Sequence, residues 1–173
     1  LHILEAYTHL YRIYPDRGLT EHIALLLYNF DDHIIDHATG HLKLFFDEDW
    51  QVKPDVVSYG HDIEAGWLLL EAATILDHEE LIDKMKTVAL NMSRAVLLEG
   101  VDTDGGLWYE YDPATQQRVA EKHWWPQAEA MVGFLNAWQL SRDDRYLQAV
   151  LDTWAFIQKH IRDHTNGEWF WGV

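Results

Sequence analysis

Two pairs of histidine and glutamate, each three residues apart, are the side chains in this sequence best suited to acid–base chemistry. The first pair is His2 and Glu5, and the second is His61 and Glu64. Residues at this spacing lie on one face of a helix, about one turn apart. A carboxylate beside an imidazole can select its tautomer, increase its basicity or bind a substrate hydroxyl, so the pairs predict proton transfer.

A structural interpretation of these pairs stays open, because the helix dipole favours an acidic residue in the first turn of a helix. For a single pair, that interpretation would be preferred over a catalytic one. The same pair, however, occurs twice about 60 residues apart, and capping a helix does not require histidine. A third pair with the same spacing, Pro126 and Glu129, has proline in place of histidine, and we call these three pairs the recurring marks.

Tryptophan is the second signal, with nine in the sequence. Flat aromatic faces mixed with carboxylates and amides suit a neutral polyhydroxylated ring, which predicts a sugar ligand. Of the adjacent Trp124 and Trp125, we expect one to line a pocket and the other to pack. We expect Trp138 and Trp154, in the middle of helices, to belong to the core. The tryptophans near the histidine and glutamate marks are Trp67, Trp108, Trp124, Trp125, Trp169 and Trp171.

The charge balance argues against polyanionic partners. The 173 residues include 29 acidic and 13 basic side chains, which gives a formal charge of −16. Nucleic acids and anionic membrane surfaces need clustered Lys and Arg, so we expect neither as a partner. The longest apolar runs are also far shorter than a membrane-spanning helix.

Several other chemistries lack their residues. The sequence has no cysteine, which removes thiolate catalysis and cysteine zinc sites. It has no glycine-rich phosphate loop and no Gly-x-Ser-x-Gly motif. His33 and His37 have a spacing that can bind zinc, but no His-Glu-x-x-His pattern accompanies them, and we expect no metal.

An internal repeat predicts the elements that position the chemical groups. Three segments place glycine in a turn before aromatic and strand-prone residues, which predicts short β excursions. Upstream of each excursion, an inner helix that is apolar on nearly every side precedes a more amphipathic outer helix. Thr20 and Ser141 resemble helix starts. The excursions are 39–46, 103–110 and 165–171, the inner helices are 1–14, 62–76 and 127–140, and the outer helices are 20–38, 80–98 and 146–163.

This repeated unit is the plan of an open helical solenoid or of a closed α/α barrel. A solenoid would suit a binding module, and a closed barrel would suit a pocket. The histidine or proline marks stand at the start of the inner helices, directly after an excursion, so they face one end of the assembly. Polar residues gathered at one end of apolar helices are typical of a catalytic mouth.

Four blocks of sequence stand out along the chain: Leu1–Tyr7, Ser58–Leu69, Lys122–Ala130 and Trp169–Gly172. Together, and in this order, they resemble the cellobiose 2-epimerases of the N-acylglucosamine 2-epimerase superfamily. The resemblance implies an all-α fold, an (α/α)6 barrel of six repeats of about 60 residues, of which fewer than three are present. The chain would then be a single partial barrel domain covering the middle-to-late part of a family member, with repeats at about 1–60, 61–125 and 126–173.

The resemblance implies epimerisation at C2 of the reducing-end sugar of a β-1,4 disaccharide such as cellobiose or lactose, without a cofactor. One imidazole removes the C2 proton, an enediolate forms, and a second imidazole returns a proton to the opposite face. By motif match, His61 is one acid/base residue, Glu64 orients the substrate beside it, and His2 assists ring opening or stabilises the enediolate.

The same match implies five substrate-binding residues. Trp124 would stack on a sugar ring, and Trp171, or with less support Trp169, would contact the distal sugar. The full set of implied binding residues is Trp124, Trp171, Tyr59, Glu129 and Trp67. The resemblance also implies a cytoplasmic enzyme acting on a small-molecule disaccharide.

The family's second catalytic histidine would lie beyond Val173, and its substrate-binding arginine and asparagine before Leu1. We therefore expect the 173-residue piece alone to be inactive. Other readings stay open: an epimerase or aldose–ketose isomerase acting on a monosaccharide such as mannose or N-acylglucosamine, a glycoside hydrolase using Glu64 and Glu129, and a non-catalytic carbohydrate-binding repeat.

Overall fold

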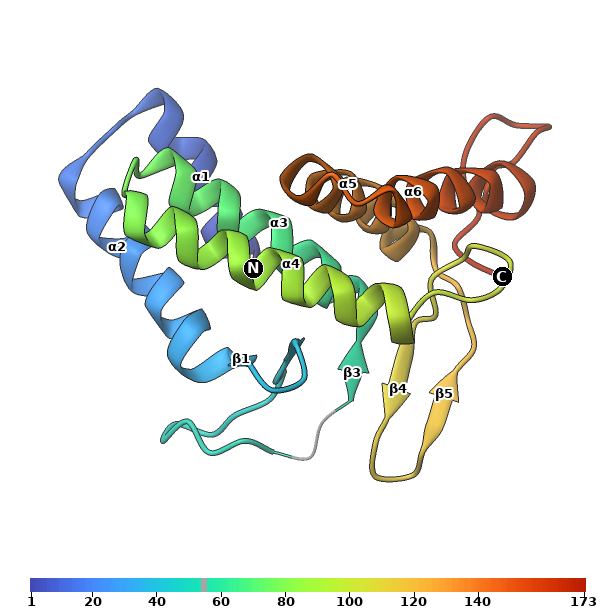
Figure 1. The fold of residues 1–173 in the computed structure, drawn as a ribbon, viewed down its shortest axis with the longest axis horizontal. Coiled ribbons are helices and arrows are strands. Elements are labelled where there is room, and N and C mark those ends of the chain that lie inside the picture. Colours follow the sequence, from blue (N-terminus) through green and yellow to red (C-terminus); the bar gives the residue numbers. More distant parts are fainter. Residues whose placement is uncertain (54–55) are drawn as a thin grey trace.

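Three helical hairpins follow one another along the chain in the computed structural model, which describes residues 1–53 and 56–173. The first helix of each hairpin is an inner helix and the second an outer helix, which confirms the all-α prediction and the predicted alternation (Figure 1). The inner helices are α1 (His2–Ile13), α3 (Tyr59–Ile75) and α5 (Trp124–Ser141), and the outer helices are α2 (Arg17–Asn29), α4 (Glu79–Glu99) and α6 (Asp144–Phe156).

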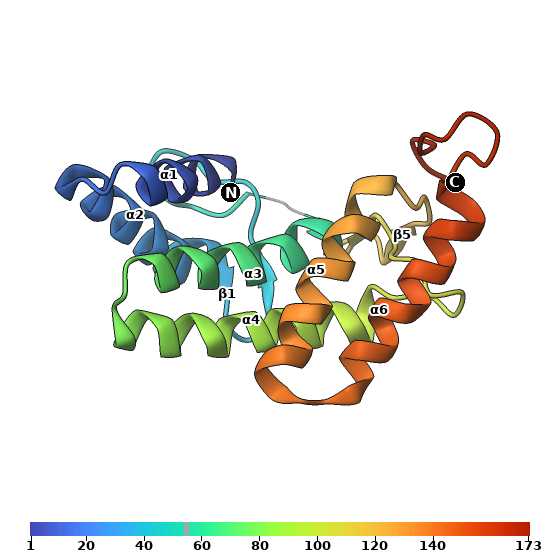
Figure 2. The same cartoon turned by 90° about the horizontal axis from the view of Figure 1, so that it is seen from above.

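Helix α3 is the centre of the assembly. It packs against α1, α4 and α5, and the view from above shows α1 and α4 on opposite sides of it (Figure 2). Most of its residues are buried, as expected for a helix that is apolar all round. Helices α3 and α5 approach closely, since a Cβ atom on Gly133 would collide with the side chain of Ile63. Glycine at this position lets the two inner helices come together.

Two outer helices end in a wider turn. The π-helical segments η1 (Phe30–Ile34) and η2 (Ile157–Ile161) continue α2 and α6 without a break. Each leads directly into the following β excursion. A π turn holds one more residue than an α turn, so it rotates the residues before it relative to those after it.

The predicted helix starts at Thr20 and Ser141 are wrong. Thr20 lies inside α2, where its hydroxyl donates to the Asp16 carbonyl at 3.1 Å, and Ser141 ends α5. The N-caps are instead Asp16 and Asp143, whose carboxylates accept backbone N–H groups of the first turn. A carboxylate fits this position well because it accepts a hydrogen bond and carries the charge that the helix dipole favours.

The predicted β excursions are present as short antiparallel pairs. Strands β1 (Ile35–Asp36) and β2 (His41–Leu42) form the first, while isolated bridges at Val101–Leu107 and Arg162–Trp169 form the others. The turn glycines Gly40, Gly105 and Gly167 have φ values of +83°, +87° and +86°, a region that glycine enters without a steric penalty.

One β-hairpin was not predicted from the sequence. Strands β4 (Glu110–Asp112) and β5 (Gln117–Val119) pair with each other, and β4 also pairs with β3 (Val57–Ser58). The result is a three-stranded sheet of order β3-β4-β5. Because β3 leads directly into α3, this sheet fixes the entry of the chain into the central helix.

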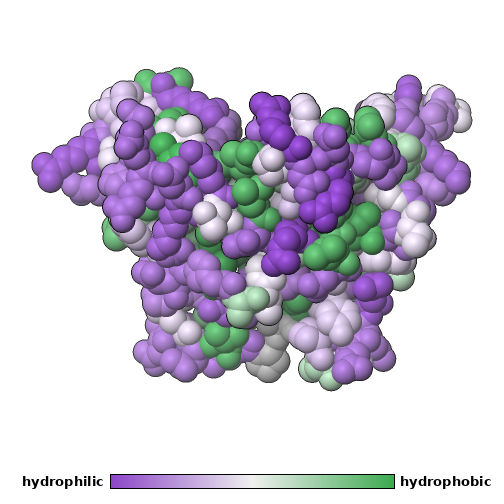
Figure 3. Space-filling view, viewed as in Figure 1, coloured by the Kyte–Doolittle hydropathy of each residue, from purple (hydrophilic) through white to green (hydrophobic). Residues whose placement is uncertain are grey.

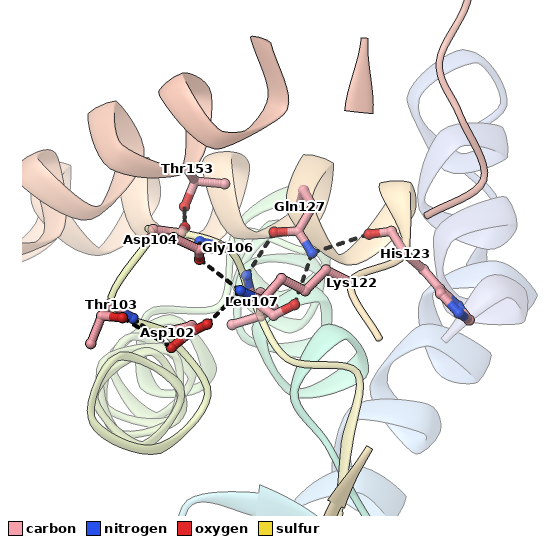
Figure 4. Close-up of polar contacts among 10 residues, drawn as sticks. Asp102, Thr103, Asp104, Gly106, Leu107, Lys122, His123, Gln127 and Thr153 are labelled. Atoms are coloured by element: carbon pink, nitrogen blue, oxygen red, sulfur yellow. Dashed lines mark hydrogen bonds and ion pairs between the residues drawn. The ribbon is translucent and has the colours of Figure 1, made fainter. Parts of the chain in front are cut away.

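The first two excursions are each attached to the inner helix that follows by one buried side chain. The backbone N–H of Leu42 donates to Asp62 Oδ1 at 2.8 Å, and that of Leu107 donates to Gln127 Oε1 at 2.7 Å. Gln127 also donates from Nε2 to the Leu107 carbonyl at 2.9 Å (Figure 4). Asp62 and Gln127 occupy equivalent positions, one residue after His61 and Pro126. We call these two side chains the excursion anchors.

The surface agrees with the acidic composition. The face in Figure 3 is largely hydrophilic, with hydrophobic patches toward its centre. Trp154 contradicts the sequence prediction that it belongs to the core, because 44% of it is exposed, whereas Trp138 is half-buried against the core. Trp154 lies on the exposed face of the amphipathic helix α6.

None of the helices in the described part of the chain is long and apolar enough to cross a bilayer.

We predict that Gly133→Ala lowers the free energy of unfolding by about 1–3 kcal/mol, because the added methyl group overpacks the α3–α5 contact. Gly66→Ala in α3 is the matched control. Its methyl group would meet the Ala89 carbonyl at an ordinary 3.5 Å, so it should leave stability unchanged or raise it. Urea unfolding of both variants decides the point, and equal effects would contradict it.

Candidate active site

The imidazole of His61, which lies in the first turn of α3, is held by two neighbouring side chains. Ser58, the last residue of β3, shares a hydrogen bond of 2.8 Å between its Oγ and His61 Nδ1. The ring of Trp125 lies against the imidazole, with ring centroids 4.8 Å apart. Within the described residues, Nδ1 is the ring nitrogen that is hydrogen-bonded, so Nε2 is the nitrogen left to exchange protons with a ligand.

Burial lowers the pKa of His61, and the nearby charge of His2 lowers it further. An imidazole with a pKa below its ordinary value is neutral at pH 7. His61 is therefore suited to accept a proton there.

Two carboxylic acids from neighbouring inner helices accompany the imidazole. Glu64 on α3 is only 6% exposed, and burial together with the charge of Glu129 raises its pKa from 4.5 to about 7. Burial also raises the pKa of Glu129 on α5, although a hydrogen bond of 2.9 Å from Trp67 Nε1 to Glu129 Oε2 opposes this. Close to neutral pH, Glu64 can therefore donate or accept a hydrogen bond.

Helix α1 contributes His2 and Glu5 to the same end of the assembly. His2 Nδ1 and Glu5 Oε2 are 3.7 Å apart on an exposed surface. Their charges act on Glu64 and Glu129 across the helix boundaries. The structure thus brings together the starts of α1, α3 and α5, which unites His2, His61, Glu64, Trp67 and Glu129.

A pocket of about 290 Å³ opens beside His61. Its walls combine the two histidines with apolar groups from the end of the first hairpin and the first excursion. The lining residues are Leu1, His2, Phe30, Ile34, Leu42, Lys43, Leu44, Phe46 and His61.

A second pocket, of about 530 Å³, has aromatic walls. It is lined by Trp124, Ala128, Glu168, Trp169 and Trp171. Trp124 and Trp169 meet edge to face, with ring centroids 6.4 Å apart. Trp124 thus lines a pocket while its neighbour Trp125 packs against His61 and Gly60, as we expect of an adjacent pair. Aromatic faces with one carboxylate suit a sugar ring.

Pairing of two backbone segments positions the aromatic pocket. The N–H of Trp124 donates to the Trp171 carbonyl at 3.0 Å, and Lys122 and Val173 bond to each other's backbone. Lys122 is itself buried, with its ammonium 2.5 Å from Asp102 and 2.7 Å from Asp104 (Figure 4). This ion pair fixes the segment before α5 to the second excursion. Charged pairs of this kind keep their geometry because breaking them leaves a buried charge.

Tyr59 lines neither of the two pockets. It is 1% exposed and packs in the core, where a Cβ atom on Gly100 would lie 2.7 Å from its ring. Tyr59 stands two residues before His61, so it points to a different face of the helix. Its implied role in substrate binding therefore has no support from the geometry.

His33 and His37, whose spacing could bind zinc, make other contacts in the structure. The ring of His33 stacks on Trp50 with centroids 4.5 Å apart, and His37 Nε2 bonds to the Asp31 carbonyl at 2.9 Å. Within residues 1–53 and 56–173, no three His, Asp or Glu side chains are arranged to hold a metal ion.

Sequence reasoning missed several supporting residues. His123 lies between Tyr109 and Trp171, with ring centroids 4.0 Å and 5.5 Å away, and Ser58 orients His61. Adjacency to Trp124 was a signal for His123. Asp62 could have been found by aligning it with Gln127, since both follow the recurring mark.

Comparison with known proteins assigns the family. The model of the N-acylglucosamine 2-epimerase (GlcNAc 2-epimerase) family matches residues 1–173. The chain belongs to this family. It is 46% identical to cellobiose 2-epimerase of Bacteroides fragilis over 173 residues, 44% of that protein, and 42% identical to that of Dictyoglomus turgidum, over 99% of this chain and 43% of that protein.

A solved structure places the fold in the same group. The cellobiose 2-epimerase of Bacillus thermoamylovorans superposes with a TM-score of 0.93 at 36% identity, covering 99% of this chain and 44% of that one. The three hairpins are thus part of an (α/α)6 barrel, as the sequence resemblance implies. The chain spans a little under half the length of the relatives it matches.

The raised pKa of Glu64 yields a stability test. Its folded pKa of about 7 exceeds the unfolded value of 4.5, so the folded state binds more protons between these pH values. The stability that the raised pKa of Glu64 contributes is therefore fully present below pH 4.5 and is lost as the pH rises to about 7. We predict that Glu64→Gln raises the melting temperature relative to the parent by roughly 5 °C more at pH 8 than at pH 4.5.

Circular dichroism melts at the two pH values measure this difference. Gly66→Ala, which changes no ionisable group, is the control, and its difference from the parent should be the same at both pH values. A flat response of the Glu64 variant would contradict the assignment of a buried, proton-binding carboxyl.

Proposed function

We propose that the protein containing this chain is a sugar epimerase that inverts C2 of the reducing-end aldose of a β-1,4 disaccharide such as cellobiose or lactose, without a cofactor. The observation that carries the proposal is the imidazole of His61, which is hydrogen-bonded at Nδ1, lines a pocket together with His2 and has a pKa that burial lowers. The printed names of the relatives support it.

His61 is the base of the proposed reaction. The C2 proton of an open-chain aldose is acidified by the adjacent aldehyde, and Nε2 of neutral His61 accepts it. The electron pair moves onto the carbonyl oxygen and gives an enediolate. A proton returned to the opposite face of C2 completes inversion, and a proton returned to C1 would give the ketose instead.

Glu64 and His2 stabilise the negative oxygens in this scheme. With a pKa of about 7, Glu64 carries a proton in a large fraction of molecules at neutral pH and can donate it in a hydrogen bond. His2 lines the same pocket as His61 and assists ring opening or charge stabilisation. Glu129, bonded to Trp67, binds substrate hydroxyls from α5.

The aromatic pocket accounts for a second sugar unit. Trp124 stacks on a sugar ring, and Trp171, which is 69% exposed, is available to a distal ring. A monosaccharide would leave these surfaces unused, which favours a disaccharide. Epimerases or isomerases of monosaccharides remain the alternative within the family.

Proton exchange in heavy water tests the function. We predict that the protein encoded by the complete reading frame converts cellobiose to glucosyl-mannose with deuterium at C2, and that His61→Ala lowers this rate at least 10²-fold. The 173-residue chain alone should be inactive. His9→Ala, on the exposed part of α1, is the control and should retain the rate. Release of glucose would indicate a hydrolase, and binding without exchange a carbohydrate-binding module.

The pH dependence of kcat/KM tests the state of His61. Because burial and His2 lower its pKa, the acid limb of the profile should lie below pH 6.5. We predict that His2→Gln moves this limb to higher pH by a fraction of a unit, since it removes a positive charge that disfavours protonation of His61. The limb should stay in place in His9→Gln, and a shift to lower pH in His2→Gln would contradict the assignment.

A further inference from the structure

The carboxylate of Asp62 is fully buried beside the candidate base and takes no part in the proposed proton transfer. Its Oδ1 accepts the backbone N–H of Leu42 at 2.8 Å. Its Oδ2 is 2.7 Å from Nδ1 of His41, whose side chain is 8% exposed. One carboxylate therefore joins the first turn of α3 to both residues of strand β2.

These contacts connect His61 with the wall of its own pocket. Asp62 follows His61 directly in α3, while Leu42, Lys43 and Leu44 form one wall of the 290 Å³ pocket. The bond from Leu42 to Asp62 thus fixes the distance between that wall and the helical turn that carries the imidazole. A change in this bond would move the base relative to anything held by the wall.

His41 extends the connection to a third element. Its Nε2 is 3.3 Å from Glu99 at the end of α4, so two carboxylates face the two ring nitrogens. Burial lowers the pKa of His41, but the hydrogen bond and charge of Asp62, together with Glu99, outweigh burial and raise it. A protonated His41 donates charge-assisted hydrogen bonds, which are stronger than neutral ones.

The equivalent anchor in the next repeat shows what attachment alone requires. Gln127 binds both the N–H and the carbonyl of Leu107 with a neutral amide. Attaching an excursion therefore needs neither a buried charge nor a histidine. The costlier arrangement of Asp62 and His41 occurs at the helix start that carries His61.

We propose that Asp62, held by His41, is a positioning residue that fixes His61 relative to the pocket wall formed by Leu42, Lys43 and Leu44. This inference rests on the proposed role of His61 as a base. It goes beyond that role because it assigns a kinetic function to a pair of side chains that do not touch the sugar.

Steady-state exchange kinetics with cellobiose in heavy water, using the protein of the complete reading frame, test the proposal. Asp62→Ala should lower kcat about tenfold to hundredfold and leave KM within about twofold, because misplacement of a base affects the transition state rather than binding. Asp62→Asn should restore kcat to within about threefold, since its oxygen still accepts the Leu42 N–H and its amide can donate to His41.

Thr153→Val is the matched control. Thr153 is a buried residue whose hydroxyl donates to the Gly105 carbonyl at 3.0 Å, so it attaches the second excursion without touching the start of α3. It should keep the parental kcat at a temperature where circular dichroism shows all variants folded. If Asp62→Ala does not fold, His41→Ala takes its place with the same expected loss of kcat.

A second measurement separates failure of this proposal from failure of the proposed function. The ¹³Cε1 resonance of His61 should broaden or split in Asp62→Ala and return to a single line in Asp62→Asn, whether or not the protein turns over sugar. An unchanged kcat with an unchanged resonance in Asp62→Ala would overturn the positioning role. An equal loss of kcat in Thr153→Val would overturn it as well. A parent protein without exchange would overturn the proposed function alone, and the resonance would still decide on positioning.

Discussion

The arrangement of this molecule depends on a hydrogen bond between a side chain in the first turn of an inner helix and the backbone of the excursion before it. An inner helix that is apolar on all sides can slide and rotate among its neighbours, because hydrophobic contact is not directional. Asp62 and Gln127 remove that freedom, since each binds one defined leucine amide. The helix starts, and the polar groups on them, are thereby brought to one end in a fixed register.

The electrostatics of the site follow from this gathering of helix starts. Glu64 and Glu129 come from different inner helices, and burial raises the pKa of both; the charge of Glu129 adds to the rise at Glu64, and the charge of Glu5 adds to the rise at Glu129. His61 responds in the opposite sense, because burial and the charge of His2 disfavour its protonated form. The same low-dielectric environment therefore raises the pKa of the acid and lowers the pKa of the base.

Much of this fold can be read from periodicity. The all-round apolar character of α3 and α5, the turn glycines and the recurring histidine and glutamate spacing are local patterns, and they predict His61 and Glu64 as candidate site residues. Tyr59 and Trp154 could not be placed in this way, because the direction of one side chain depends on the exact start and rotation of its helix. The bond between Leu42 and Asp62 joins residues 20 apart, and nothing local in the sequence marks the pairing.

Because α2 ends in a π-helical turn, the shape of the pocket depends on the number of residues in that turn. Phe30 and Ile34, the first and last residues of that turn, both line the pocket that holds His61. Removing one residue from the segment would restore an α turn and rotate one side chain relative to the other by about 100°. Evolution could thus reshape the space beside the base through an insertion or deletion, while every residue at the helix starts stays the same.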